Sequence, residues 1–424
     1  MESIIKDQLV QYLNNKGLIS KYQHAFIKNH STATNILESI NDWLVGIKSP
    51  NCTDVVYIDF SKAFDSIVIS KLLLKLHCYG ISGLLLSWIK CFLSDRTQCV
   101  VVDRCQSLFN KVTSGVPQGS VLGPILFILY INDIDCVCCG NVKLQLFADD
   151  AKIYSSINID RASVSLQQSL DNLCHWASDW QLVINISKCA VLSVCSKPLL
   201  TDHAYSINGI LVTHHNSYND LGITVCQNLS FNGHINNIVS RARQRVSILF
   251  RGFSSRNCNV LRRAYITYVR PIVEYNTIVW NPCVKYLIDI IERVQRNFSK
   301  RIPSLSSMTY AERLAFLNLE TLELRRLHFD LIFYYKVFNH LAPFDPETLF
   351  SMHTPPPNLR SSSEVVKMPF KSSDKLVSGI FYRSIDAWNS LPLDVRFTPT
   401  LPCFKRRIKC IDFSVYLKGS INSE

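Results

Sequence analysis

The stretch Lys143-Leu-Gln-Leu-Phe-Ala-Asp-Asp-Ala-Lys-Ile-Tyr154 carries two adjacent carboxylates between two short apolar runs. Residues 143–148 and 151–154 predict two strands, and Asp149-Asp150 between them predicts a tight hairpin turn. Another acid, Asp59, lies near the end of residues 54–60, where β-branched and aromatic residues indicate a buried strand. The sequence thus places three carboxylates at the ends of predicted strands.

Such carboxylates suggest a cation site. A charged group on a buried strand costs stability unless it is paired or binds a cation. Mg²⁺ prefers oxygen ligands, and two such ions about 4 Å apart can activate a 3′-hydroxyl and stabilise a leaving pyrophosphate. Asp59, Asp149 and Asp150 therefore suit a two-metal polymerase site. The alternative is that Asp149 and Asp150 are ordinary turn residues that serve local hydrogen bonds.

The surrounding sequence alternates predicted helices and strands. We expect helices at residues 32–44, around the leucines at 72–76 and at 121–131, and strands at 98–102 and 190–194. Gly115, Pro117 and Gly119 indicate a loop before the third of these helices. A further amphipathic helix is predicted by apolar residues that recur every three or four positions, namely Leu166, Leu170, Leu173, Ala177 and Trp180.

The charge of the chain is concentrated in one section. Residues 230–301 hold 13 Lys or Arg against 3 acids, which is +10 of the formal net charge of +12. A basic block of this kind suggests a polyanionic partner, most simply nucleic acid. The alternative is a solvated basic face without a partner.

The cysteines and the length of the apolar runs indicate the cellular compartment of the protein. The 16 cysteines are scattered, and the one cluster, Cys136, Cys138 and Cys139, lacks the paired spacing of a zinc site, so we expect reduced and mostly buried thiols. The start does not resemble a signal peptide, and runs such as residues 125–131 are too short to cross a bilayer. We expect an intracellular protein, in the nucleus, the cytoplasm or both, without a membrane partner.

Three motifs give a more specific indication. They are Tyr57-Ile-Asp-Phe-Ser-Lys-Ala-Phe-Asp65, Ser114-Gly-Val-Pro-Gln-Gly-Ser-Val-Leu-Gly-Pro124 and Phe147-Ala-Asp-Asp150. In order and separation they resemble the core motifs of reverse transcriptases, in the form typical of non-LTR (LINE-like) retrotransposons. The resemblance implies an α+β, right-hand polymerase fold, with an antiparallel palm sheet backed by helices, partial fingers and a helical thumb.

The resemblance also implies a domain order and partners. Residues 1–229 would be the reverse transcriptase domain, with partial fingers and palm. Residues 230–303, which include Arg262-Arg-Ala-Tyr-Ile-Thr-Tyr-Val-Arg270, resemble the thumb of jockey-type elements. Residues 304–424 would be a C-terminal extension of unknown role, with a Pro- and Ser-rich linker at 354–363. The expected partners are an RNA template, a DNA primer and deoxynucleoside triphosphates.

Individual roles follow from the same resemblance. Asp59 and Asp149 would bind two Mg²⁺ ions, with Mn²⁺ as a second candidate, and Asp150 would be the third acid of the set. Phe64 would contact the sugar of the incoming nucleotide and exclude a 2′-hydroxyl. Lys188 resembles a lysine that protonates departing pyrophosphate, and its alternative role is that of a surface lysine.

Other positions would contact the substrates. Gln118 and Gly119 resemble the loop that packs against nucleotide and template, where glycine lets the backbone come close. Tyr218-Asn-Asp-Leu-Gly-Ile223 resembles the hairpin that grips the primer, although the family more often has Tyr and Leu adjacent. Phosphate contacts that do not read sequence, and therefore weaken with salt, are expected from Arg241, Arg243, Arg245, Arg262, Arg263 and Arg270.

Departures from the family leave two hypotheses. An endonuclease and the first half of the fingers would have to be supplied elsewhere or be absent, and Ala25 and Ile27 stand where the family has Gly and Arg, with Lys28 as the nearby substitute. The first hypothesis is an RNA-directed DNA polymerase that copies element RNA into DNA. The second is a catalytically silent remnant that only binds nucleic acid. A group II intron maturase or telomerase-like enzyme is a further alternative, against which the thumb and tail argue.

Overall fold

The computed structural model describes residues 1–48, 52–157, 160–195, 203–353, 365–367 and 381–419. The chain divides into two compact units, one of residues 1–221 and 226–228, the other of residues 222–225 and 229–424. Each unit has its own core. No helix in the described residues is both long enough and apolar enough to cross a membrane.

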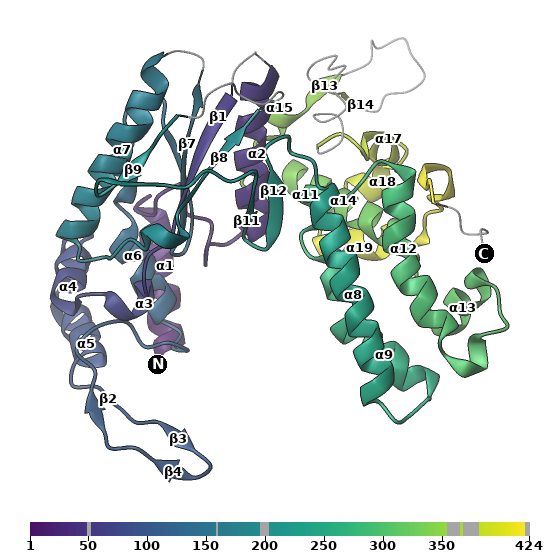
Figure 1. Ribbon diagram of the computed structural model, residues 1–424, viewed down its shortest axis with the longest axis horizontal. Coiled ribbons are helices and arrows are strands. Elements are labelled where there is room, and N and C mark those ends of the chain that lie inside the picture. Colours follow the sequence, from purple (N-terminus) through teal and green to yellow (C-terminus); the bar gives the residue numbers. More distant parts are fainter. Residues whose placement is uncertain (49–51, 158–159, 196–202, 354–364, 368–380, 420–424) are drawn as a thin grey trace. The chain divides into compact units, whose positions relative to one another are not determined.

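A four-stranded antiparallel sheet forms the centre of the first unit (Figure 1). Its strand order is β6 (Lys143–Phe147), β7 (Asp150–Ile157), β1 (Cys52–Ile58) and β8 (Ala190–Val194). Every residue of β1 is buried, as expected for a central strand rich in β-branched and aromatic residues. The pairing of Ile58 with Ala151 places the end of β1 level with the β6–β7 hairpin.

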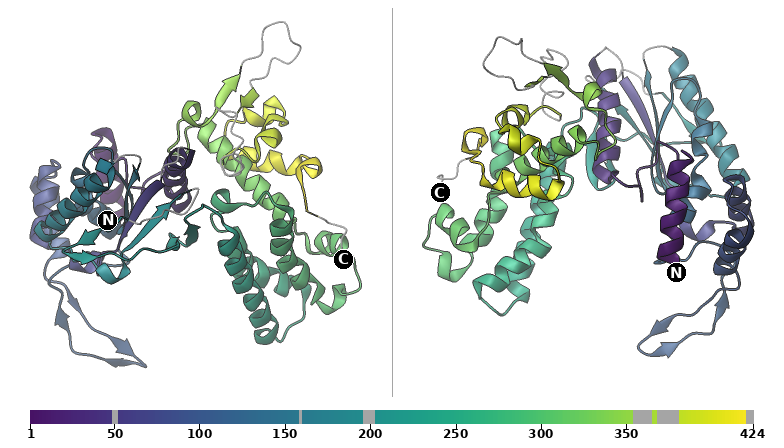
Figure 2. Two further views of the ribbon diagram at one scale, coloured as in Figure 1. Left: turned by 45° about the horizontal axis from the view of Figure 1, so that its top comes forward. Right: turned by 180° about the vertical axis from the view of Figure 1, so that it is seen from behind.

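Helices cover both faces of this sheet. They are α1 (Glu2–Asn15), α2 (Thr32–Lys48), α3 (Ala63–Ser66), α4 (Ile69–Cys78), α5 (Gly83–Leu93), α6 (Gly123–Ile131) and α7 (Asp160–Asp179). Helices α7 and α2 lie on opposite faces (Figures 1 and 2). The predicted helices at 32–44 and 121–131 are thus confirmed. The second begins at Gly123 because Pro124, which lacks a backbone N–H, suits the first turn of a helix.

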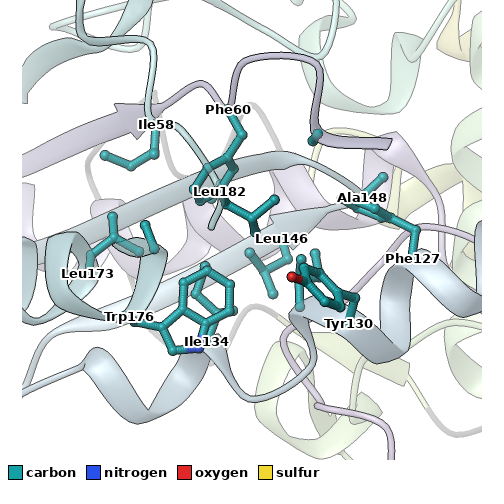
Figure 3. Close-up of a cluster of buried hydrophobic side chains, with 14 of the residues drawn as sticks. Ile58, Phe60, Phe127, Tyr130, Ile134, Leu146, Ala148, Leu173, Trp176 and Leu182 are labelled. Atoms are coloured by element: carbon teal, nitrogen blue, oxygen red, sulfur yellow. The ribbon is translucent and has the colours of Figure 1, made fainter. Parts of the chain in front are cut away.

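The hydrophobic core lies between the sheet and helices α6 and α7. Residues 125–131 of α6 are all buried, and α7 contributes the fully buried leucines of the predicted amphipathic face. Figure 3 shows Trp176 and Leu173 of α7, Tyr130 and Phe127 of α6 and Leu146 of β6 gathered in one cluster. An α+β fold with an antiparallel sheet backed by helices is therefore present, as the sequence predicts.

The strand predicted at residues 98–102 is wrong in extent, because the structure divides it into two short strands. Two-residue strands β2 (Thr97–Gln98) and β3 (Val101–Val102) pair with β5 (Asn110–Lys111) and β4 (Cys105–Gln106), in a ribbon outside the main sheet. Val100, Val101 and Val102 are more than 60% exposed. A high β-propensity indicates residues that fit a pleated, half-buried surface, and whether such a surface is present depends on the neighbouring elements.

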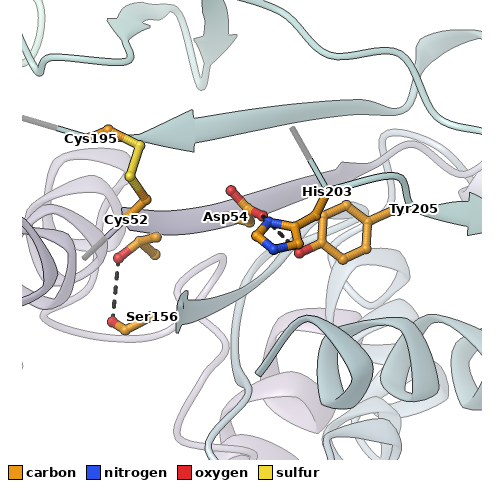
Figure 4. Close-up of a disulfide and its surroundings, with 7 residues drawn as sticks. Cys52, Asp54, Ser156, Cys195, His203 and Tyr205 are labelled. Atoms are coloured by element: carbon orange, nitrogen blue, oxygen red, sulfur yellow. Dashed lines mark hydrogen bonds and ion pairs between the residues drawn. A yellow bond between two sulfur atoms is a disulfide. The ribbon is translucent and has the colours of Figure 1, made fainter. Parts of the chain in front are cut away.

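The prediction of reduced and mostly buried cysteines is wrong for one pair in its redox state and for most of the free thiols in their burial. All 16 cysteines lie within the described residues, and Cys52 and Cys195 form a disulfide that joins the ends of β1 and β8 (Figure 4). Among the free cysteines only Cys189 is buried. Beside the disulfide, Asp54 is fully buried and accepts a hydrogen bond of 2.7 Å from the Tyr205 hydroxyl, while His203 Nδ1 lies 3.4 Å from its Oδ2 (Figure 4).

Short elements complete the first unit. The 3₁₀ turns η1 (Ile134–Val137) and η2 (Ile186–Lys188) flank the sheet, and β9 (Ser206–Ile207) pairs with β10 (Ile210–Leu211). The last strand of the first unit, β11 (Ser217–Asp220), forms a hairpin with β12 (Ile223–Cys226), of which residues 223–225 are assigned to the second unit. The hairpin suggested by residues 218–223 is thus present, with Leu221 and Gly222 at positive φ as a two-residue turn of this kind requires.

The second unit is mainly helical. Its longer helices are α8 (Asn232–Gly252), α9 (Cys258–Tyr268), α12 (Lys285–Lys300), α13 (Tyr310–Leu317) and α14 (Leu322–Phe338). Its shorter elements are α10 (Arg270–Glu274), α11 (Thr277–Trp280), η3 (Pro303–Leu305), α15 (Pro346–Leu349), α17 (Ile385–Asn389), α18 (Leu393–Arg396), α19 (Leu401–Arg407), η4 (Ile408–Cys410), η5 (Ser414–Tyr416) and the paired strands β13 (Ser351–His353) and β14 (Val365–Lys367).

Aromatic stacking and helix caps hold this unit together. The Phe298 ring of α12 stacks on Tyr265 of α9 with 4.3 Å between ring centroids. Thr309 and Glu312 form a capping box at the start of α13, which satisfies backbone N–H groups that the helix leaves open. The predicted helix around 320–338 is confirmed as α14. The linker predicted at 354–363 lies outside the described residues.

Candidate active site and nucleic-acid groove

Three carboxylates meet at the end of the central sheet. Asp59 directly follows β1, and its backbone carbonyl accepts a hydrogen bond of 2.8 Å from the Asn185 N–H. Phe147 pairs with Asp150, so the two-residue turn consists of Ala148 and Asp149, and Asp150 is the first residue of β7. The predicted Asp-Asp turn is therefore corrected by one position. The β1–β7 pairing brings Asp59 to the same sheet end as both hairpin acids.

Burial and neighbouring charges raise the pKa of both hairpin acids. Burial, and then the charge of Asp59, raises the pKa of Asp149 above its usual value. Burial, followed by the charges of Asp149, Asp220 and Asp59, raises the pKa of Asp150 to about 6, and Lys152 opposes that rise. Carboxylates whose charges repel in this way are stabilised by a cation placed between them.

The residues present fit a substrate-bound divalent metal. Among the described residues no three His, Cys, Asp or Glu side chains form a complete metal cage. Mg²⁺, however, is usually held by one or two carboxylates together with substrate phosphates and water. Within the described residues Asp59 Oδ2 is buried and accepts no hydrogen bond, which leaves it open to a metal ion. That Asp59, Asp149 and Asp150 hold such ions stays a prediction.

Lys188 approaches this cluster. It ends the 3₁₀ turn η2, its side chain is 66% exposed, and its Nζ lies 3.5 Å from Asp59 Oδ2. The position combines access to solvent with an ion-pair contact to Asp59, which is predicted to be catalytic. Its assignment as a proton donor stays a prediction.

Phe64 lies in the short helix α3, one turn beyond Asp59. Its ring is half-buried and stacks on Phe127 of α6, with ring centroids 4.0 Å apart and an interplanar angle of 16°. Phe127 is fully buried, so the Phe64 ring is supported on one side by the core. This geometry suits a ring that must hold its place against a nucleotide sugar.

The loop of residues 114–119 is joined to the Phe64 segment. Gly115 has φ +79°, and a Cβ there would lie 2.7 Å from Asp65 Cα, so the close backbone approach requires glycine. The Gln118 side chain donates a hydrogen bond of 2.8 Å to Asp65 Oδ1. Gly119 has φ +83°, and no atom lies within 4 Å of the position that a Cβ would take. Glycine is therefore favoured there by the positive φ and not by a close contact within the protein.

Gln23 is a positioning residue that the sequence reasoning did not identify. Its side chain is 1% exposed, and its Oε1 accepts hydrogen bonds from the backbone N–H groups of Ala25, at 2.9 Å, and Ala148, at 3.0 Å. Ala148 has φ +53°, an unfavourable value for a residue with a side chain. Gln23 therefore holds the strained turn that carries Asp149.

The predicted phosphate-binding arginines differ in their surroundings. Arg241, Arg243, Arg245 and Arg263 are exposed. Arg262 is half-buried and donates to the Asn318 carbonyl at 3.3 Å. The Arg270 side chain is 19% exposed and lies 3.5 Å from Glu274, which also pairs with Arg325. Arg262 and Arg270 thus already form polar contacts within the protein.

A basic groove of about 590 Å³ runs along α8. Its polar lining residues recur every three or four positions, which places them on one helix face: Asn236, Ser240, Arg243, Ser247 and Arg251. Among the described residues neither Arg243 nor Arg251 forms an ion pair. Arg251 was not among the predicted residues, although its spacing of eight from Arg243 indicates the shared face.

Comparisons with known proteins identify the family of this chain. Residues 1–245 match the family model described as reverse transcriptase (RNA-dependent DNA polymerase). The chain is 30% identical over 314 residues to the RNA-directed DNA polymerase from mobile element jockey of Drosophila melanogaster, with 71% of this chain and 34% of that protein covered. It is 28% identical over 322 residues to the probable RNA-directed DNA polymerase from transposon BS of the same organism, with the same coverage.

The chain belongs to the reverse transcriptase (RNA-dependent DNA polymerase) family. It spans about a third of the length of the curated relatives it matches. Among solved structures, apo telomerase from Candida Tropicalis is similar at 12% identity and a TM-score of 0.44, over 75% of this chain and 53% of that one.

Gln23→Met tests the support of the catalytic turn. The substitution removes the acceptor at similar volume and leaves the Ala148 N–H without its partner, which costs about 1–3 kcal/mol. We expect faster hydrogen–deuterium exchange in the peptide 143–154, measured by mass spectrometry, and a fall of similar size in the free energy of unfolding. The exposed Gln168→Met is the matched control. Equal exchange in the two variants would show that Gln23 does not hold the turn.

Proposed function

We propose that this chain is the polymerase part of a non-LTR retrotransposon protein and that it copies element RNA into DNA. The observation that carries the proposal is the meeting of Asp59 with Asp149 and Asp150 at the end of the β1–β7 pair. Membership of the reverse transcriptase family supports it. The substrates would be an RNA template, a DNA primer and deoxynucleoside triphosphates.

Each group at the site would have a distinct task. When bound, two Mg²⁺ or Mn²⁺ ions would lower the pKa of the primer 3′-hydroxyl and stabilise charge on the departing pyrophosphate. Asp59, Asp149 and Asp150 would hold those ions. Lys188, exposed beside Asp59, would bring a proton to the leaving group. The Gln118–Gly119 loop, which hydrogen-bonds to Asp65, would line the nucleotide.

One observation favours a second candidate, a silent remnant that only binds nucleic acid. Ile27 is half-buried and supplies no charge where the family motif has arginine. The neighbouring Lys28 is exposed and lines a groove of about 670 Å³ together with Phe26. Lys28 therefore offers a cation close to the missing one, and we favour the active polymerase.

Primer extension tests the proposal. The purified chain would be incubated with a poly-rA/oligo-dT template, dTTP and Mg²⁺, alongside the double variant Asp149→Ala, Asp150→Ala. We expect extension by the parent and loss of at least about 10³-fold in the variant, because electrostatic stabilisation of the reacting groups depends on these acids. Absence of extension by the parent, with salt-sensitive RNA binding retained, would favour the silent remnant.

Phe64→Ala tests the sugar contact. Removing the ring removes the clash with a 2′-hydroxyl, and a clash of about 1–3 kcal/mol corresponds to roughly 5- to 150-fold in rate. We expect the preference for dTTP over UTP, measured as a ratio of kcat/KM values, to fall by that factor. Phe109→Ala, on the exposed ribbon, is the control. An unchanged ratio in an active Phe64→Ala variant would remove Phe64 from nucleotide selection.

The basic groove predicts which arginines bind phosphate. Arg243→Ala combined with Arg251→Ala should weaken duplex binding and lower the slope of log K against log salt by about two, one for each lost phosphate contact. Arg241→Ala combined with Arg245→Ala removes the same charge from another face of α8 and should change the slope less. Fluorescence anisotropy over a salt series measures both. An equal or larger effect of the second pair would contradict the groove.

A further inference from the structure

We propose that the buried ion pair between Lys152 and Asp220 positions strand β11, and through it the primer 3′ end, beside the catalytic acids. The inference rests on the proposed polymerase function. Lys152 Nζ lies 2.6 Å from Asp220 Oδ2, and the two side chains are 4% and 6% exposed. The pair joins β7 of the main sheet to the last residue of β11, both within the first unit.

The pair belongs to a matched set of four side chains. Tyr57 on β1 and Lys152 on β7 lie directly opposite each other in the sheet. Tyr218 and Asp220 are two residues apart on β11, so they point to the same side of that strand. Tyr57 stacks on Tyr218 with 3.9 Å between centroids, while Lys152 pairs with Asp220. Two neighbouring contacts fix both the place and the direction of β11.

The same alternation connects this set to the reaction centre. Lys152 is two residues after Asp150, and Tyr57 is two residues before Asp59. Side chains two apart on a strand share a face, so the contacts to β11 adjoin the carboxylates on that face of the sheet. Tyr218 is half-buried, which leaves part of its ring open next to the acids. A primer end that rests on β11 would thus lie within reach of Asp59 and Asp150.

A buried ion pair is a costly way to hold two strands together. Removing both charges from water is unfavourable, and apolar residues of similar volume often give equal or higher stability. An ion pair differs from an apolar contact because it is directional and allows one register. Lys152 is further enclosed by Trp43 of α2, with Nζ 5.6 Å from the ring centroid. We therefore attribute to this ion pair the placement of β11 more than a gain in the free energy of folding.

Photo-crosslinking of the primer end tests the inference. A primer with 4-thiothymidine at its 3′ end would be annealed to RNA, bound to the full chain and irradiated, and the attached peptide identified by mass spectrometry. We expect attachment within residues 217–220 in the parent, a loss of at least about tenfold in Lys152→Met, and recovery in Lys152→Arg, which keeps the charge. Binding affinity for the duplex, which depends on the α8 groove, should change less than about twofold.

A second variant separates positioning from folding. Lys152→Met combined with Asp220→Leu leaves no unpaired buried charge and should fold, yet it should still lose the crosslink. A folded double variant with parental crosslinking would overturn the inference, as would a parent that crosslinks elsewhere. Crosslinking needs binding and not catalysis, so a parent that crosslinks at β11 but extends no primer would overturn the proposed function and leave this inference standing.

Discussion

The antiparallel pairing of β1 with β7 determines where the functional side chains of the first unit lie. Ile58 pairs with Ala151, so Asp59 and the Ala148–Asp149 turn emerge at one end of the sheet. Because successive side chains point to opposite faces, a slip of one residue would turn Asp150 and Lys152 toward the core beneath α6 and α7. Strand β1 is fully buried and also pairs with β8 on its other edge, so such a slip would cost much of the free energy of folding.

Segments far apart in the sequence then hold the acids in place. Gln23 fixes the turn before Asp149, Gly115 allows the loop of residues 114–119 to meet the Phe64 segment, and Lys152 secures β11. These contacts are mostly hydrogen bonds to backbone groups or buried polar pairs, which are directional. The core supplies the stability of the unit, and these polar contacts supply the geometry that the proposed nucleotidyl transfer would need.

Much of this arrangement could be predicted from sequence because its signals are local. The β6–β7 hairpin, strand β8 and the leucine face of α7 each follow from a short pattern, and the three motifs indicate the acids. Contacts between residues that are far apart in the sequence give no such local pattern. Gln23 and Ala148 are 125 positions apart, and Lys152 and Asp220 are 68 apart. The division of the strand predicted at 98–102 follows from its pairing with residues 105–111, which no local pattern in the valines indicates.

The central claim is that Asp59, Asp149 and Asp150 form one cation site once substrates are bound. Electron paramagnetic resonance of Mn²⁺, titrated into the chain with primer–template and a non-reactive dNTP analogue, measures this directly. We predict two bound ions per chain, as two-metal transfer requires, and weaker binding of at least one in Asp59→Asn with duplex binding intact. Mn²⁺ binding that is the same in the parent and in Asp59→Asn would contradict the claim.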